Sequence, residues 1–150
     1  MSVVVFPGRG TFVRRIIGSR AYDGGAGNGA VGAATIFTVT GEVYVVILVS
    51  FCTENLVGLT ATISLGITGS TALFVAATTA EDIDNGEFWV DTVPDANGVD
   101  VPTALLDVAI TDDILTQIAT AAVTDGTIRF TLYWLPLSSD GNVTLASGVT

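Results

Sequence analysis

The stretch TIRFTLYWL, residues 127–135, decides the fold class of this chain. Apolar and polar residues alternate along it, and this period of two predicts a β-strand with one buried face. The turn signal Asp125-Gly126 precedes the stretch and Pro136 closes it. The face predicted to be buried carries Ile128, Phe130, Leu132 and Trp134.

Two more stretches support an all-β chain. Residues 59–67 alternate in the same way, and their row of Thr and Ser predicts a solvated sheet surface. Residues 43–51 are apolar on both faces, which predicts a central strand that is covered on both sides or lies at a subunit interface. The tight connection Thr40-Gly41-Glu42 predicts a hairpin between residues 34–39 and 43–51.

Weaker strand patterns at regular spacing complete the fold prediction. Residues 112–122 also fit a short helix capped by Thr111, so this alternative stays open. The sequence therefore predicts an all-β, single-domain β-sandwich or jelly-roll-like fold with an extended N-terminal arm. The weaker strands are predicted at residues 34–39, 72–77, 87–91, 105–110 and 114–122.

The first 32 residues differ in composition from the rest. Five glycines between Asp23 and Gly32 give the pattern of a flexible linker. We therefore predict an arm and Gly-rich hinge over residues 1–32 and the β-sandwich domain over residues 33–150. The arm is either a solvated tail or a segment that binds a partner, and the residues predicted to bind the partner are Arg9, Phe12, Arg14, Arg15 and Arg20.

Net charge and hydropathy argue against two classes of binding partner, nucleic acids and membranes. The formal net charge is −10, although four of the five basic residues lie in the first twenty positions. A nucleic-acid-binding body needs a positive surface, so we expect no nucleic-acid partner. The longest apolar run, residues 43–49, is far shorter than the roughly 20 residues of a membrane-spanning helix, so we expect no membrane partner. The N-terminus also lacks the pattern of a secretory signal peptide.

The chain lacks the side chains that most enzymes use for proton transfer and Schiff-base formation, because it contains no His and no Lys. Ser-His-Asp and Cys-His catalysis and the usual zinc sites are therefore excluded within the chain. Paired carboxylates remain in principle, but most acids lie in predicted turns. We predict no enzyme, no catalytic or metal site and no cofactor, and we assign the single cysteine, Cys52, to the core.

Two local patterns leave an alternative open. Asp82-x-Asp84-Asn85-Gly86 resembles the start of a calcium loop, but position twelve is Val93 instead of Glu, which favours an Asx-type turn. Phe88-Trp89 and Tyr133-Trp134 each place aromatic rings on both faces of a strand. We expect one ring of each pair in the core and the other at an interface, with a carbohydrate-binding face as the alternative.

Several segments between about residues 30 and 145 resemble small virion structural proteins of tailed bacteriophages. The resemblance implies a virion component without catalysis, preferably a capsid decoration (cement) protein on the capsid exterior. Its partners would be the major capsid protein and neighbouring copies of itself, with a homotrimer favoured. The alternative is a tail, baseplate or fibre-associated module that binds a host surface glycan or protein. The segments that carry the resemblance are residues 38–41 with 45–48, 61–69, 78–84 with 88–91, and 133–142.

Overall fold

The computed structural model describes residues 12–150. In this range the chain forms eleven strands and two short 3-10 helices, η1 (Ala80–Asp82) and η2 (Thr103–Leu105), and none of its helices is long and apolar enough to cross a membrane. The strands are β1 (Arg14–Ala21), β2 (Gly32–Thr40), β3 (Val43–Val57), β4 (Thr62–Ile67), β5 (Ser70–Thr79), β6 (Glu87–Phe88), β7 (Asp95–Ala96), β8 (Leu106–Ile110), β9 (Ile114–Ala119), β10 (Asp125–Pro136) and β11 (Asn142–Leu145).

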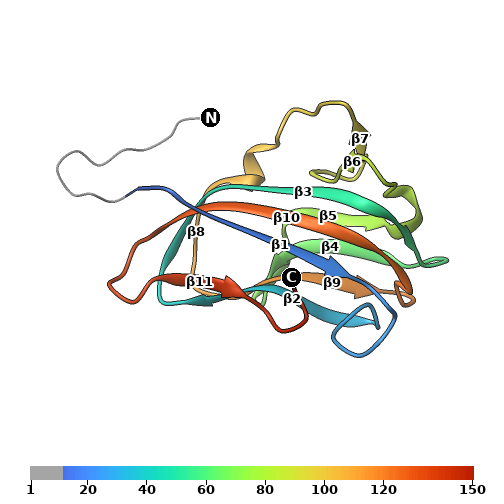
Figure 1. Cartoon of the computed structure of the whole chain (residues 1–150), viewed down its shortest axis with the longest axis horizontal. Coiled ribbons are helices and arrows are strands. Elements are labelled where there is room, and N and C mark those ends of the chain that lie inside the picture. Colours follow the sequence, from blue (N-terminus) through green and yellow to red (C-terminus); the bar gives the residue numbers. More distant parts are fainter. Residues whose placement is uncertain (1–11) are drawn as a thin grey trace.

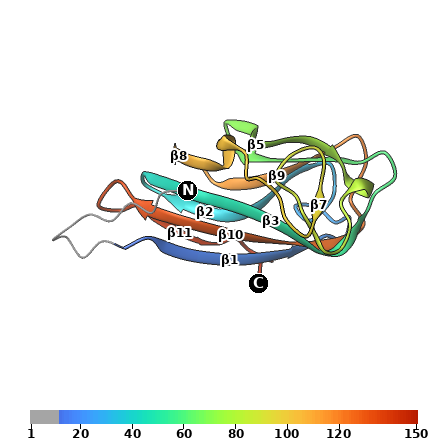
Figure 2. The same ribbon diagram turned by 90° about the horizontal axis from the view of Figure 1, so that it is seen from above.

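The strands form two antiparallel sheets that pack face to face (Figures 1 and 2). The six-stranded sheet has the order β1-β10-β3-β6-β7, and β8 pairs with the first part of β3. The five-stranded sheet has the order β11-β2-β9-β4-β5. The predicted all-β sandwich is therefore confirmed.

The core lies between the sheets and follows from the alternation of the strands. In β10 the predicted inner face, Ile128, Phe130, Leu132 and Trp134, is buried, whereas Arg129, Thr131 and Tyr133 are not. Gly126 and Leu135, near the strand ends, are also buried. Cys52, on the inner face of β3, is fully buried as predicted. The inner face of the five-stranded sheet meets β3 and β10 with Phe37, Ile63, Leu65, Ile114 and Ile118.

β4 and β9 test two of the strand predictions. Residues 114–119 pair with both β2 and β4, so they form a strand and the helix alternative is wrong. The strand predicted from residue 59 begins at Thr62, because Gly58 and Ala61 close a turn in which Thr60 has φ +63°. Ser64, predicted to face solvent, is buried and donates to the carbonyl oxygen of Thr71 at 2.8 Å.

The hairpin predicted at Thr40-Gly41-Glu42 is wrong. β2 belongs to the five-stranded sheet and β3 to the six-stranded sheet, so the chain crosses from one layer to the other at this turn. A tight turn specifies a reversal of chain direction but not whether the two strands share hydrogen bonds. Gly41 has φ +63°, and a Cβ there would lie 2.4 Å from a carboxylate oxygen of Asp140.

Part of the segment predicted as arm and hinge, residues 1–32, lies against the sandwich. Residues 14–21 pair with β10 along their whole length, so the sandwich includes at least β1. The Gly-rich segment folds back on itself, since Asp23 N–H donates to the carbonyl of Asn28 at 3.0 Å and Val123 N–H to that of Gly29 at 2.7 Å. A Cβ on Gly29 would lie 2.2 Å from the Val123 carbonyl oxygen, so glycine serves close packing here.

Candidate interaction surface

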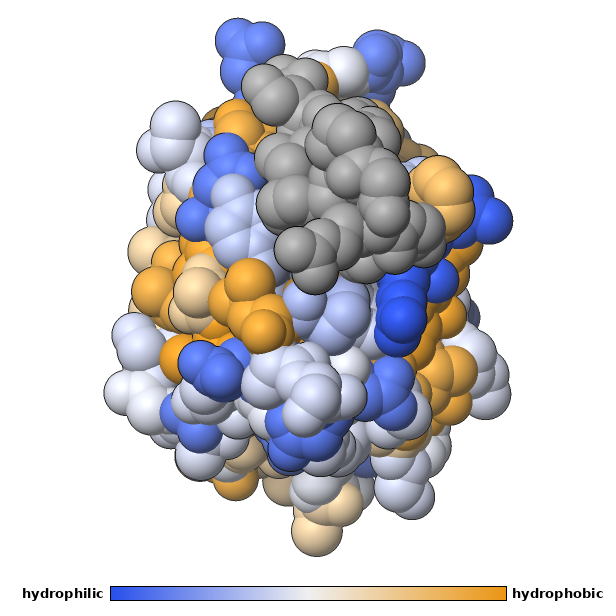
Figure 3. Space-filling model, turned by 90° about the vertical axis from the view of Figure 1, so that its left-hand side faces the viewer, coloured by the Kyte–Doolittle hydropathy of each residue, from blue (hydrophilic) through white to orange (hydrophobic). Residues whose placement is uncertain are grey.

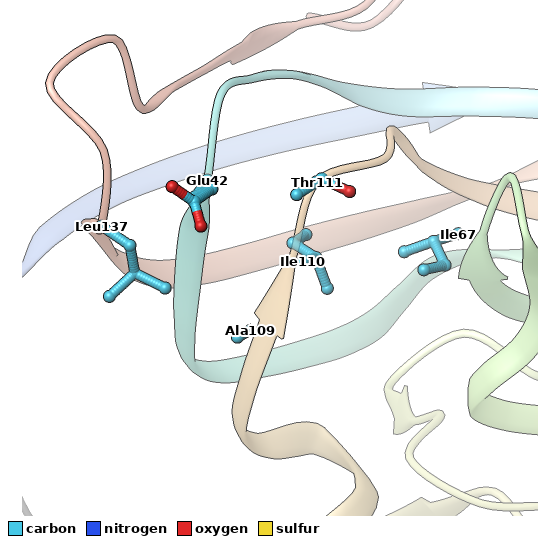
Figure 4. A pocket seen from close by; sticks show the side chains of 6 residues that line it. All are labelled: Glu42, Ile67, Ala109, Ile110, Thr111 and Leu137. Atoms are coloured by element: carbon cyan, nitrogen blue, oxygen red, sulfur yellow. The ribbon is translucent and has the colours of Figure 1, made fainter.

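A shallow hollow lies at the end of the sandwich that holds the β2–β3 turn (Figure 4). Its volume is about 190 Å³, below the roughly 300–1,000 Å³ of small-molecule sites. Figure 3 shows apolar patches broken by hydrophilic side chains over this end. Glu42 is its single ionisable lining residue, so the hollow offers no acid–base pair. The other lining residues are Ile67, Ala109, Ile110, Thr111 and Leu137.

The acidic segment 81–87 forms a turn that is held by hydrogen bonds within the segment and to β3. Glu87 accepts a hydrogen bond from the backbone N–H of Asp84 at 3.0 Å, and Asn55 accepts one from Asn85 N–H at 2.7 Å. Gly86 N–H donates to the carbonyl of Cys52 at 2.8 Å, which fixes the turn to β3. Within residues 12–150 no group of three or more potential ligands is placed to hold a metal ion.

The most distinctive surface is the outer face of the six-stranded sheet over β1, β10 and β3. Strand register places its residues in three rows, because cross-strand partners lie side by side on one face. We call this set the outer face; it contains two arginines and no carboxylate. The rows are Arg15–Tyr133–Ile47, Ile17–Thr131–Val49 and Ser19–Arg129–Phe51.

The apolar side chains of the outer face come from β1 and β3, on either side of β10. Ile17 is 41% exposed although it sits in a regular strand, and Val49 and Ile47 are only half-buried. The guanidinium of Arg129 lies 5.1 Å from the centre of the Phe51 ring, and Phe51 meets Phe88 edge to face at 5.0 Å. Cation–π contact holds the Arg129 charge over the sheet. The outer face thus carries apolar side chains on both sides of β10 together with two positive charges.

One edge of this sheet is also open. β1 pairs with β10 on one side, while on its other side Ser19 exchanges two backbone hydrogen bonds with Thr150, of 2.7 and 3.1 Å. Alternate residues of a strand direct their backbone groups to the same side, so those of Arg15 and Ile17 point toward this edge. Among the described residues they have no backbone partner there.

The residues predicted to form the binding arm are placed in different environments. Arg9 lies outside the described residues. Phe12 is 72% exposed just before β1, and Arg15 is exposed on the outer face. Arg14 lies 5.1 Å from the ring of Trp134 at the end of the sandwich. The structure therefore brings Arg14 and Arg15 close to one end of the outer face.

Arg20, the fifth of these residues, is turned into the protein and is 4% exposed. Its guanidinium donates to Asn28 Oδ1 at 2.9 Å, to the Ser147 carbonyl at 3.2 Å and to the Thr35 carbonyl. Burial lowers the pKa of this guanidinium from its usual value. The Arg20 side chain links β1 to the Gly-rich loop and to the C-terminal segment, so it is not available to a partner.

The far edge of the same sheet carries the opposite charge. β7 is the last strand in the order and begins with Asp95. Asp91 and Asp95 are exposed, and Val93 between them in the sequence is 67% exposed. Asp91 accepts a hydrogen bond from Val93 N–H at 2.7 Å, which shapes the bend. We call Asp91, Val93 and Asp95 the acidic edge.

Neither composition nor alternation singles out Ile17 or the acidic edge as a surface feature. The signal for the outer face was present in residues 43–51, whose apolar character on both faces predicted a covered strand or a subunit interface. Which other strands complete that face depends on strand order, which alternation does not specify.

The fold defines an all-β protein of the antiparallel sandwich class. The sequence matches no protein-family model, and no curated protein matches it significantly. Among solved structures the chain is similar to a chain of the cyanophage Pam1 capsid asymmetric unit, with a TM-score of 0.53 and 18% sequence identity. The similarity covers 90% of this chain and 94% of that one, and at this identity it concerns the fold.

Proposed function

We propose that this chain is a non-enzymatic structural protein of a tailed-phage virion, acting as a capsid decoration (cement) protein on the capsid exterior. It binds the major capsid protein and neighbouring copies of itself, with a homotrimer favoured. The observation that carries the proposal is the shared fold with a chain of a phage capsid asymmetric unit, which extends over nearly the full length of both chains.

The outer face supports a binding role in place of a catalytic one. It combines half-buried apolar side chains with two arginines, a composition that suits burial against another protein. Its uncharged polar residues, Ser19, Thr131 and Tyr133, cost less to desolvate than charged groups. Arginines at the border form bidentate hydrogen bonds with carboxylates on a partner.

A capsid shell is stabilised when many copies of a protein each bind it with moderate affinity. Each copy needs only a modest affinity, because a protein that holds two neighbouring capsomers binds the second at high effective concentration. The open edge of β1 adds a place where an extended capsid segment can pair with the sheet. The outer face and the β1 edge can therefore each contact a different neighbour.

A sedimentation assay tests the proposal. Purified protein is mixed with expanded capsid shells that lack it, the shells are pelleted and the bound copies are counted. Saturable binding at a ratio set by the lattice symmetry axes is the expected result, and Ile17→Asp should weaken it more than Thr38→Asp, at an exposed position of β2. Absence of binding to shells, together with binding to host cells, would replace this proposal by the tail or fibre alternative.

A further inference from the structure

The six-stranded sheet carries complementary surfaces at its two ends. At the β1 end, exposed Ile17 lies in the row between those of Arg15 and Arg129. At the β7 end, exposed Val93 is flanked in the sequence by exposed Asp91 and Asp95, and Asp91 accepts a hydrogen bond from Val93 N–H. One end thus presents an exposed apolar side chain with positive charges in the neighbouring rows, and the other presents an exposed apolar side chain in an acidic segment.

The two surfaces of one copy do not meet each other. β10, β3 and β6 lie between β1 and β7 in the sheet, so the complement of each surface must come from another molecule. A second copy of this chain carries the complementary surface, and it is present wherever the protein is present. Opposite charges across such a contact favour encounter and fix its orientation.

The charges also select the symmetry of the contact. A two-fold contact between two β1 ends would place Arg15 and Arg129 of one copy against the same arginines of the other, and like charges oppose this arrangement. A contact between unlike surfaces is heterologous, and repeated copies then form a ring if the rotation between them closes or a filament if it does not. Thr150 occupies the β1 edge beside Ser19, so the contact falls at Arg15 and Ile17.

We propose that copies of this chain associate head to tail, with the acidic edge of one copy seated on the β1 end of the outer face of the next. Val93 packs against Ile17, while Asp95 meets Arg15. The inference builds on the self-association included in the proposed function, but it requires no capsid. The capsid-binding role and the contact between copies are therefore tested separately.

The test measures the mass of the full chain in solution by sedimentation velocity over a range of concentrations. Arg15→Glu and Asp95→Lys each place like charges at the contact and are expected to weaken association by about tenfold or more. The double variant Arg15→Glu with Asp95→Lys restores opposite charges at every contact between copies, so its association should return to that of the original chain. Raising the salt from about 0.05 to 0.5 M should weaken the original chain as screening increases.

Controls separate a specific contact from changes in net charge or folding. Thr38→Glu and Thr38→Lys, at an exposed position of β2, should leave association unchanged. Circular dichroism and thermal unfolding of each variant verify the fold, since Arg15 and Asp95 are both exposed. A chain that stays monomeric, single variants that associate normally, or a double variant that fails to recover would each overturn the head-to-tail contact. Shell sedimentation of the same variants then reports on capsid binding independently.

Discussion

The indole Nε1 of Trp89 donates a hydrogen bond to the hydroxyl of Thr78 at 2.9 Å, and both side chains are buried. Trp89 follows β6 of the six-stranded sheet, whereas Thr78 belongs to β5 of the five-stranded sheet. The Thr78 hydroxyl in turn donates a hydrogen bond to the carbonyl oxygen of Ala76 at 3.0 Å. This bond therefore joins the two layers on the side of the sandwich where β3 and β5 approach η2.

Thr78→Val should destabilise the fold, because it keeps the shape of the side chain and leaves the Trp89 N–H buried without an acceptor. We expect a loss of about 1–3 kcal/mol in the free energy of unfolding. Thr79→Val, at the neighbouring exposed position, should change it by less than about 0.5 kcal/mol. Urea unfolding of both variants measures the difference, and equal effects would show that the bond contributes nothing.

Arg20→Met should destabilise the fold much more than Arg15→Met. The substitution removes the donors to Asn28, Ser147 and Thr35 and leaves their oxygens without this partner. We expect a loss of about 2–4 kcal/mol for Arg20 and almost none for exposed Arg15. Thermal unfolding checks the pair. Similar stability of the two variants would contradict the role of Arg20 as an internal link.

Stability should fall as the pH rises above about 9. Burial raises the pKa of the Cys52 thiol to about 11 and also raises the pKa of the Tyr22 hydroxyl, so both groups stay protonated in the fold while they ionise in the unfolded chain. The unfolded state then binds fewer protons, and a rise in pH favours it. Below the pKa values of the unfolded chain the two states bind these protons equally, and the effect is absent.

Urea midpoints at pH 7 and pH 10 measure this alkaline loss. Cys52→Ala and Tyr22→Phe should each reduce it, although Tyr22→Phe also loses the 2.9 Å hydrogen bond to Thr116 and is less stable at pH 7. The native thiol should also react slowly with a thiol reagent at pH 8 and rapidly after unfolding. An unchanged pH dependence in both variants would contradict this origin.

Gly66→Ala and Gly69→Ala form a matched pair in the β4–β5 hairpin. A Cβ on Gly66 would lie 2.2 Å from the backbone oxygen of Ser70, where the backbone must move. A Cβ on Gly69 would meet only a carboxylate oxygen of Asp112, at 3.2 Å. We expect Gly66→Ala to cost about 1–3 kcal/mol and Gly69→Ala to cost much less, as measured by thermal unfolding. Equal tolerance of both would mean that the hairpin packs less closely than described.

The sequence predicts strands well where one face is buried and the other is not. The alternation of residues 127–135 identifies the inner face of β10, because each second side chain enters the core. The hairpin predicted at Thr40-Gly41-Glu42 does not form, because a turn signal does not specify to which sheet the next strand belongs. Residues 112–122 are ambiguous in isolation and become a strand only through pairing with β2 and β4.

The candidate surface is less predictable for a different reason. Glycines between residues 24 and 32 read as a linker, yet Gly29 serves a close approach to Val123 within a folded loop. Arg20 lies in a basic, partner-binding pattern by sequence, whereas carbonyl groups distant in the chain surround its guanidinium. The outer face itself requires three strands from separate parts of the chain, and their neighbourhood is a property of the topology.

The most direct test of the central claim is electron cryomicroscopy of capsid shells with and without the added protein. A capsid decoration protein should add density on the outer surface of the shell at equivalent lattice positions, and the sandwich should fit into that density. The outer face or the β1 edge should contact the major capsid protein there. Shells without added density, with the protein found instead on the tail of complete particles, would contradict the proposed function.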